Sequence, residues 1–196
     1  MPRRPRHPHP PDVRAHILAA ALRAFATHGY EGATVRRIGA EAKVAPGLLY
    51  HYFPNKEALL VALFEQSASM VAEPFVRAAM ETDPARKLSL LLRLSAQIVR
   101  DNQDFWRVSY GVRFQHAVVA GLAPLIAAQS VLLHGLFHHL LSELGRPNPD
   151  VEAHLLFAAI DGMFQHYVLA PDSYPLDSAV ETLIRTYGGA PASEFP

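Results

Sequence analysis

Residues 34–56 read TVRRIGAEAKVAPGLLYHYFPNK, and this stretch decides the fold of the N-terminal part of the chain. Thr34 suits the N-cap of a short helix that runs to about residue 41. Pro46 suits the first turn of a second short helix, because its missing N–H would be unpaired there in any case. The residues between them, 42–44, are expected to form a tight turn.

The apolar and basic residues of this stretch fall on opposite sides. Ile38, Val44 and Leu49 are expected to point inward, whereas Arg36 and Arg37 lie on the outer side. Two short helices joined by a tight turn, with basic residues outside, have the geometry of a helix-turn-helix. The second helix of such a unit lies in the major groove of DNA. The stretch therefore predicts a DNA-binding unit.

The second short helix, residues 46–52, carries groups that suit this role. Gly47 lets the backbone approach DNA closely. Tyr50, His51 and Tyr52 can donate hydrogen bonds to phosphates. Lys56, in the first turn of the next helix, adds a charge beside backbone N–H groups that themselves favour phosphate.

Helical periodicity extends along the rest of the chain. It predicts a helix over about residues 12–28 that ends at Gly29, and a connecting helix over 55–73 that Pro74 kinks or ends. No sustained period-2 alternation or hairpin signal is present. The sequence thus predicts an all-α protein of about nine helices. The further helices are expected at about 84–102, 104–116, 122–144, 150–169 and 176–187.

The composition sets limits on the class of protein. Half of the 196 residues are hydrophobic, which predicts a folded chain, and the lack of cysteine excludes disulfides and thiolate metal sites. Residues 1–56 hold nine Lys/Arg against three Asp/Glu, whereas residues 57–196 hold nine against fifteen. This asymmetry indicates that one end meets a polyanion. Since we find no uncharged apolar window of membrane-spanning length and no signal peptide, we expect a cytoplasmic protein.

Two further segments predict contacts with partners. Residues 1–11 hold five of the sixteen prolines, and this arm either reaches a minor groove through Arg3, Arg4 and Arg6 or forms a disordered tail. The helix over 150–169 is apolar nearly all round and must be covered on every side. Together with 176–187 it predicts a homodimer held by a four-helix bundle through residues 151–187.

Four motifs over residues 12–64 resemble the tetracycline-repressor (TetR-type) family of transcription regulators. They lie in the segments AFATHGYEGATV and IGAEAKVAPGLLYHYFPNKEALL, at the spacing of that family. The chain departs from the family pattern at Lys43, where the turn usually has glycine, at Ala45, where Ser or Thr usually caps the recognition helix, and at Leu48, where a polar residue is common.

The resemblance implies a homodimer on a palindromic operator and repression that a small ligand relieves. A helix-turn-helix domain over residues 12–56 would be followed by a ligand-binding and dimerisation domain over 74–196. The phosphate contacts implied are Thr34, Tyr50, His51, Tyr52 and Lys56. Those nearest the base edges are Arg36, Pro46, Gly47 and Leu48, and Arg37 serves either phosphate or base.

Ligand contacts are expected from aromatic and histidine residues of the C-terminal body, since apolar walls with few polar groups suit a small molecule. The alternative is that these side chains are simply core. The candidates are Phe105, Trp106, Tyr110, Phe114, His134, Phe137, His138, Met163, His166 and Tyr167.

The eleven histidines raise the question of a metal. His134 and His138 are four residues apart on one helix face, a spacing that can hold zinc or nickel. No Asp or Glu has matching spacing on that helix and no HExxH motif is present, so we expect no metal site, no cofactor and no enzyme. Two alternatives stay open, namely a DNA-binding regulator without a ligand and a histidine-rich, metal-dependent helical enzyme.

Overall fold

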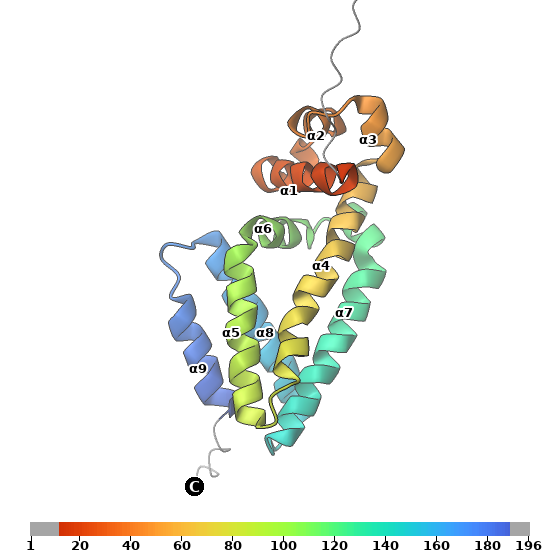
Figure 1. Ribbon diagram of the computed structural model, residues 1–196. Coiled ribbons are helices and arrows are strands. Elements are labelled where there is room, and N and C mark those ends of the chain that lie inside the picture. The colour runs from red at the N-terminus through yellow and green to blue at the C-terminus, as the bar shows by residue number, and fades with distance from the viewer. Residues whose placement is uncertain (1–11, 189–196) are drawn as a thin grey trace, which may run out of the picture. The chain divides into compact units, whose positions relative to one another are not determined.

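The structure of the chain is a computed structural model that describes residues 12–188, without the side chains of His116, Ala117 and Val119. Within this range the regular structure consists of nine α-helices and no strand (Figure 1). This confirms the all-α prediction for the described residues. The predicted arm, residues 1–11 with Arg3, Arg4 and Arg6, lies outside them. The chain divides into two compact units between Leu63 and Phe64.

The first unit holds α1 (Val13–Gly32), α2 (Val35–Glu41), α3 (Pro46–Tyr52) and the start of α4 (Lys56–Ala78). Gly29, at φ 69°, interrupts α1 at the predicted place, but one more helical turn follows it to Gly32.

Side-chain caps fix where these helices begin. The carboxylate of Asp12 accepts from the N–H of Ala15 at 2.9 Å, and the hydroxyl of Thr34 accepts from the N–H of Arg37 at 3.2 Å. Each cap satisfies a helix N–H that has no partner within the helix. Beneath the caps lies an apolar core that includes the fully buried Ile17, Phe25, Ile38 and Leu49, and also Phe53.

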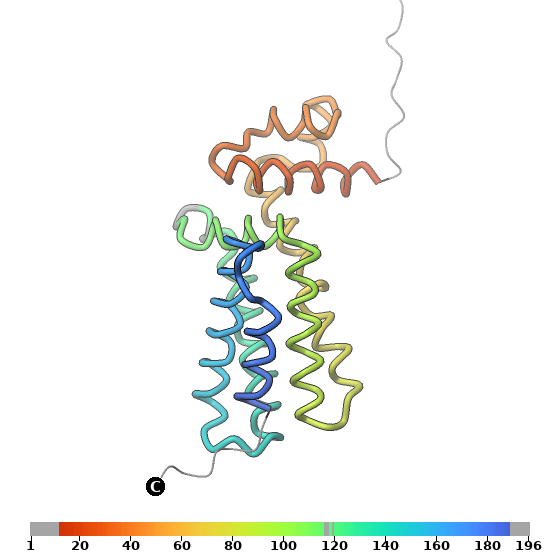
Figure 2. The backbone as a smooth tube through the Cα atoms, turned by 90° about the vertical axis from the view of Figure 1, so that its left-hand side faces the viewer, coloured from red at the N-terminus to blue at the C-terminus, as the bar shows by residue number. Residues whose placement is uncertain are grey.

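The second unit contains the rest of α4, from Phe64 onward, and five further helices. In Figures 1 and 2, α4, α5, α7, α8 and α9 run alongside one another, and α6 lies across one end of them. The main packing pairs are α7 with α8 and α5 with α9. The five helices are α5 (Pro84–Asp101), α6 (Gln103–Val112), α7 (His116–Glu143), α8 (Pro149–Leu169) and α9 (Leu176–Gly188).

Two prolines lie inside helices of the second unit. From the sequence, one helix was expected to kink or end at Pro74, and another was expected to begin at about residue 122, close to Pro124. α4 continues through Pro74 to Ala78, and α7 begins at His116 and continues through Pro124. A proline removes one helix hydrogen bond, but packing of the neighbouring turns can outweigh that loss. Phe75 packs against Phe137 with ring centroids 5.6 Å apart, directly after Pro74. The helix therefore does not end at Pro74, and of the two predicted outcomes the kink stays a prediction.

Two helices are long and apolar enough, by length and composition, to span a membrane: α4 and residues 120–143 of α7. The expectation that the chain holds no such segment is wrong by this measure. Core helices of water-soluble proteins pass the same test, and both helices here line a cavity within the second unit. Their composition alone therefore does not indicate a membrane protein.

Candidate DNA-binding surface and ligand cavity

The turn between α2 and α3 depends on the backbone of Lys43. Its φ is 52°, in the left-handed region that favours glycine. The N–H of Val44 then donates to the carbonyl of Gly39 at 3.1 Å, which closes the turn. Lys43 therefore adopts the conformation of the glycine it replaces, at a cost of about 1 kcal/mol.

The outer side of α3 is open to solvent. Pro46, Gly47 and His51 are exposed, and Tyr50 and Tyr52 are 53% and 39% exposed. No side chain caps this helix, as expected from Ala45. The N–H groups of Leu48 and Leu49 already donate to the carbonyl of Ala45, so it is the exposed tyrosine hydroxyls that can meet an anionic partner.

The remaining predicted DNA contacts, on α2 and around it, differ in whether their side chains already make contacts within the protein. The hydroxyl of Thr34 is engaged in its cap, and the guanidinium of Arg37 donates to the carbonyl of Gly32 at 3.0 Å. Arg36 is exposed on the same short helix. Leu48, on α3, is half-buried. Arg36 is therefore the α2 side chain best placed to extend toward a partner.

Lys56 has a structural role that the sequence did not reveal. Its ammonium donates to the carbonyl of Tyr30 at 2.8 Å and lies 4.1 Å from the centroid of the Tyr30 ring, and its side chain is only 19% exposed. Burial raises the pKa of Tyr30. Lys56 thus fastens the end of α1 to the start of α4, and its contact with phosphate stays a prediction.

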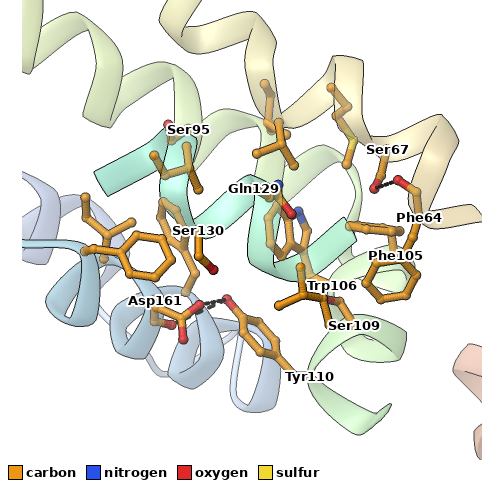
Figure 3. Close-up of a pocket in the computed structure, with 18 of the residues that line it drawn as sticks. Phe64, Ser67, Ser95, Phe105, Trp106, Ser109, Tyr110, Gln129, Ser130 and Asp161 are labelled. Carbon is orange, nitrogen blue, oxygen red and sulfur yellow. Dashed lines mark hydrogen bonds between the residues drawn. The ribbon is translucent and has the colours of Figure 1, made fainter. Parts of the chain in front are cut away.

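A cavity of about 430 Å³ lies within the second unit, between α4, α5, α6, α7 and α8 (Figure 3). That volume is in the range of small-molecule sites. Most of its lining is aromatic or aliphatic. Five of the ten predicted ligand residues line it: Phe105, Trp106, Tyr110, Phe114 and Phe137.

The other five predicted residues lie outside this lining, and a ligand contact through them stays a prediction. His134 and His138 each follow a lining residue, Leu133 and Phe137, so they are turned about 100° around α7 from the cavity, and His134 faces Asp150 of α8. Met163 and Tyr167 are buried in the helix core, and His166 is exposed and stacks on Tyr174.

The polar side of the cavity is formed by Arg113, Asp161 and Tyr110. Arg113 donates to both carboxylate oxygens of Asp161, at 2.5 and 2.9 Å, and stacks over the Tyr110 ring at 4.7 Å. The Tyr110 hydroxyl points toward Asp161 (Figure 3). Burial and the Asp161 carboxylate raise the pKa of Tyr110, so its hydroxyl stays neutral and can donate a hydrogen bond.

One further donor lies at the cavity without a partner among the described residues. The indole N–H of Trp106 is buried and makes no hydrogen bond, and Figure 3 labels this residue among those that line the cavity. Buried donors are normally paired, so a bound molecule with an acceptor group would satisfy this one.

The contribution of α4 to the cavity was not predicted from the sequence. Phe64, Ser67, Met70 and Phe75 all line it, although this helix was predicted only as a connection. The apolar residues of α4 recur at helical spacing, which predicts a buried face. The same spacing results whether that face packs against solid core or lines a cavity.

Comparison with known proteins places the chain in a family. The family described as "Bacterial regulatory proteins, tetR family" matches residues 17–63. The family described as "Tetracyclin repressor-like, C-terminal domain" matches residues 89–189, which is more than half of the chain. The chain belongs to the TetR family. This confirms the resemblance inferred from the N-terminal motifs.

Individual members are similar to this TetR-family protein over different lengths. The transcriptional repressor AcnR of Corynebacterium efficiens is 40% identical over 101 residues, which are 47% of this chain and 54% of the repressor. The match thus spans about half the length of that relative. The fatty acid degradation regulator FadR of Bacillus halodurans superposes with a TM-score of 0.79 at 22% identity, covering 96% of this chain and all of that one. FadR of Bacillus subtilis, solved with stearoyl-CoA, gives 0.75 at 18% identity, covering 90% and 98%.

Proposed function

We propose that this TetR-family protein is a sequence-specific DNA-binding repressor that a small, largely apolar ligand releases from its operator. The observation that carries the proposal is the exposed outer side of α3, with Gly47, Tyr50, His51 and Tyr52 open to solvent on a helix-turn-helix. Regulation rather than catalysis is the role that membership of this family supports, and we propose that the protein acts in the cytoplasm.

The side chains of α3 divide the recognition into two tasks. Tyr50, His51 and Tyr52 would hold the phosphate backbone, which fixes orientation without reading sequence. Pro46, Gly47 and Leu48 offer no side-chain donor, so sequence would be read by Arg36, by apolar contact with thymine methyl groups and by DNA shape. Thr34, Arg37 and Lys56 complete the predicted contact set.

Binding of fluorescent duplex DNA tests this surface. We expect the logarithm of the affinity to fall linearly with the logarithm of salt concentration, because phosphate contacts release counterions. Loss of one hydrogen bond to a charged phosphate should lower the affinity of Tyr50→Ala by about tenfold. The control is His139→Ala, an exposed residue of α7. Equal binding by wild type and Tyr50→Ala would contradict the assigned surface.

The cavity supports a ligand with a long apolar part. Its walls are mainly aromatic and aliphatic, and the polar groups among them include the Asp161 carboxylate and the unpaired Trp106 N–H. A fold neighbour was solved with stearoyl-CoA. We propose an acyl group as the apolar part, with its carbonyl oxygen as the acceptor for the Trp106 N–H. Because α4 begins at Lys56 in the first unit and lines the cavity from Phe64, a ligand would contact the helix that starts next to α3.

The test is release of bound DNA by acyl-CoAs of increasing chain length, with free coenzyme A as the control. Release that grows with chain length would support the acyl proposal. If no acyl-CoA binds and DNA binding is intact, the alternative of a regulator without a ligand would gain support, because the body would then serve only to dimerise.

We also propose a homodimer through residues 151–187. Val151, Leu155 and Leu169 of α8 are 48%, 56% and 73% exposed, although they are apolar. A second copy would cover them in a four-helix bundle of α8 and α9. Leu155→Glu should yield monomers in light scattering at micromolar concentration, whereas Met80→Glu, at another exposed apolar position, should not. A dimer unaffected by Leu155→Glu would exclude this interface.

A further inference from the structure

Three metal-binding side chains converge on the outside of the second unit, away from the cavity lining. His134 of α7 faces Asp150 and His154, which belong to the first two turns of α8. Their candidate donor atoms all lie within 4.8 Å of one another, and His134 Nε2 is 3.2 Å from Asp150 Oδ1. Among the described residues, this is the one group of three His, Asp or Glu side chains that converges in this way.

We propose that His134, Asp150 and His154 form a binding site for a divalent transition-metal ion, with zinc as the representative. Two imidazoles and a carboxylate are the donor set that zinc, nickel and cobalt prefer. From the sequence no metal site was expected, because α7 has no carboxylate at matching spacing. The fold supplies that carboxylate from α8, together with a second imidazole one turn further on.

The distances suit an ion that binds nitrogen and oxygen at about 2.0–2.2 Å. Two donors on a tetrahedral ion are about 3.4 Å apart at such bond lengths, close to the His134–Asp150 separation. His154 must turn, because its ring now stacks on that of His134 with centroids 4.0 Å apart, and a metal bond lies in the plane of each imidazole. His154 is exposed, so its ring is free to turn.

The surroundings of His134 limit the affinity. Its Nδ1 is buried without a hydrogen-bond partner, so Nε2 is the nitrogen that faces the cluster. Metal-binding histidines usually donate their other ring N–H to a partner, and loss of that bond weakens binding by about 10–100-fold. We therefore expect a Kd on the order of micromolar. His138 stands one turn along α7, with its ring centroid 6.4 Å from that of His134, and is a candidate fourth ligand.

A bound ion would tie α7 to the beginning of α8 across the 144–148 connection. Both helices also supply walls of the cavity, through Leu133 and Phe137 on α7 and Phe157 and Asp161 on α8. Metal binding would therefore stabilise the arrangement of helices on which the cavity depends. This inference does not rest on the proposed DNA-binding or ligand-release function.

The experiment is calorimetric titration of Zn²⁺ into the full-length, untagged, metal-stripped chain, followed by Co²⁺ binding monitored by visible absorption. We expect one ion per chain, and Co²⁺ bands typical of four-coordinate nitrogen and oxygen ligands. His154→Ala should lower the affinity at this site at least about tenfold, since it removes a ligand. His154 lies within the segment proposed for the dimer, so far-UV circular dichroism and light scattering should first show that the variant keeps the helix content and the oligomeric state of the wild type.

The matched control is His139→Ala on α7. His139 is 75% exposed on its side chain, contacts Glu143 and is not part of the cluster, so this change should leave metal binding unaltered. The chain holds other histidines, including His7 and His9, so the difference between the two variants is the readout. The expected Kd is on the order of micromolar, so a Kd for Zn²⁺ above about 100 µM, two orders of magnitude weaker, would overturn the proposal. Equal losses in both variants would overturn it as well.

Discussion

The substitution Gly47→Ala separates DNA contact from protein stability. Gly47 is the second residue of α3, and a Cβ added there meets no atom within 4 Å. Alanine therefore costs nothing sterically within the protein. Since glycine in a helix is less favourable than alanine by about 0.5–1 kcal/mol, the free energy of unfolding should stay level or rise slightly.

The expected effect on DNA binding has the opposite sign. If the backbone at Gly47 approaches a base edge or a phosphate closely, the added methyl group occupies the space that the DNA needs. A loss of about 1.4 kcal/mol on this account is a tenfold weaker complex. We expect at least that loss, with an unchanged salt dependence, because no phosphate contact is removed.

The assay is fluorescence anisotropy with operator DNA, alongside thermal unfolding of the same preparations. The control is Gly111→Ala, since Gly111 is an exposed glycine in α6 and a Cβ there also meets no atom within 4 Å. The control should keep wild-type affinity. Wild-type affinity in a folded Gly47→Ala protein would refute the close approach of this backbone to DNA.

Three further predictions follow from single residues. Lys43→Gly should raise the free energy of unfolding by up to about 1 kcal/mol in urea titrations, because it relieves the positive φ; a decrease would show that the turn is not strained. Tyr30→Phe should flatten the fall of stability above pH 10. Burial raises the pKa of Tyr30 above the value of about 10 that tyrosine has in the unfolded chain. The neutral phenol therefore contributes its full stabilisation of the fold below about pH 10. Above about pH 10 the free energy of unfolding falls by up to about 1.4 kcal/mol per pH unit, because the unfolded chain then loses the phenol proton more readily than the folded one. Equal slopes for wild type and variant in urea unfolding between pH 9.5 and 11.5 would contradict this. Ser109→Leu should fill part of the cavity and abolish release by acyl-CoA while DNA affinity stays intact; release at wild-type concentrations would argue against this cavity as the ligand site.

The helices of the first unit could be predicted closely because their ends depend on local signals. Thr34 caps α2 through its own side chain, and Pro46 begins α3 at the predicted position. Ile38 and Leu49 are fully buried, as their place in the pattern indicated. These signals need no knowledge of distant residues.

The C-terminal site was less predictable because it depends on pairs far apart in the sequence. Arg113 and Asp161 are 48 residues apart, and neither was named as a ligand residue, yet they form the polar side of the cavity. On α7 the neighbouring residues Leu133 and His134 point in different directions. Leu133 lines the cavity, whereas His134 meets Asp150 of α8. Periodicity identifies an apolar face but does not show whether that face meets core, cavity or a partner.

The same limit applied to Lys56 and to the histidine cluster. Lys56 reads as a surface charge in sequence, whereas its ammonium is held by the carbonyl and ring of Tyr30, 26 residues earlier. Asp150 and His154 come beside His134 only because α7 and α8 pack against each other. Long-range packing decides these environments, and spacing along one helix does not report it.

The proposed function requires that the chain, as a dimer, recognises a DNA sequence through α3. Selection of duplexes from a random pool by the purified protein, followed by sequencing, tests it most directly. We expect enrichment of a palindromic consensus, with half-sites about one helical turn or a multiple of it apart, and weaker enrichment by Gly47→Ala and Tyr50→Ala. No enriched sequence at low salt, where phosphate contacts are strongest, would contradict the account.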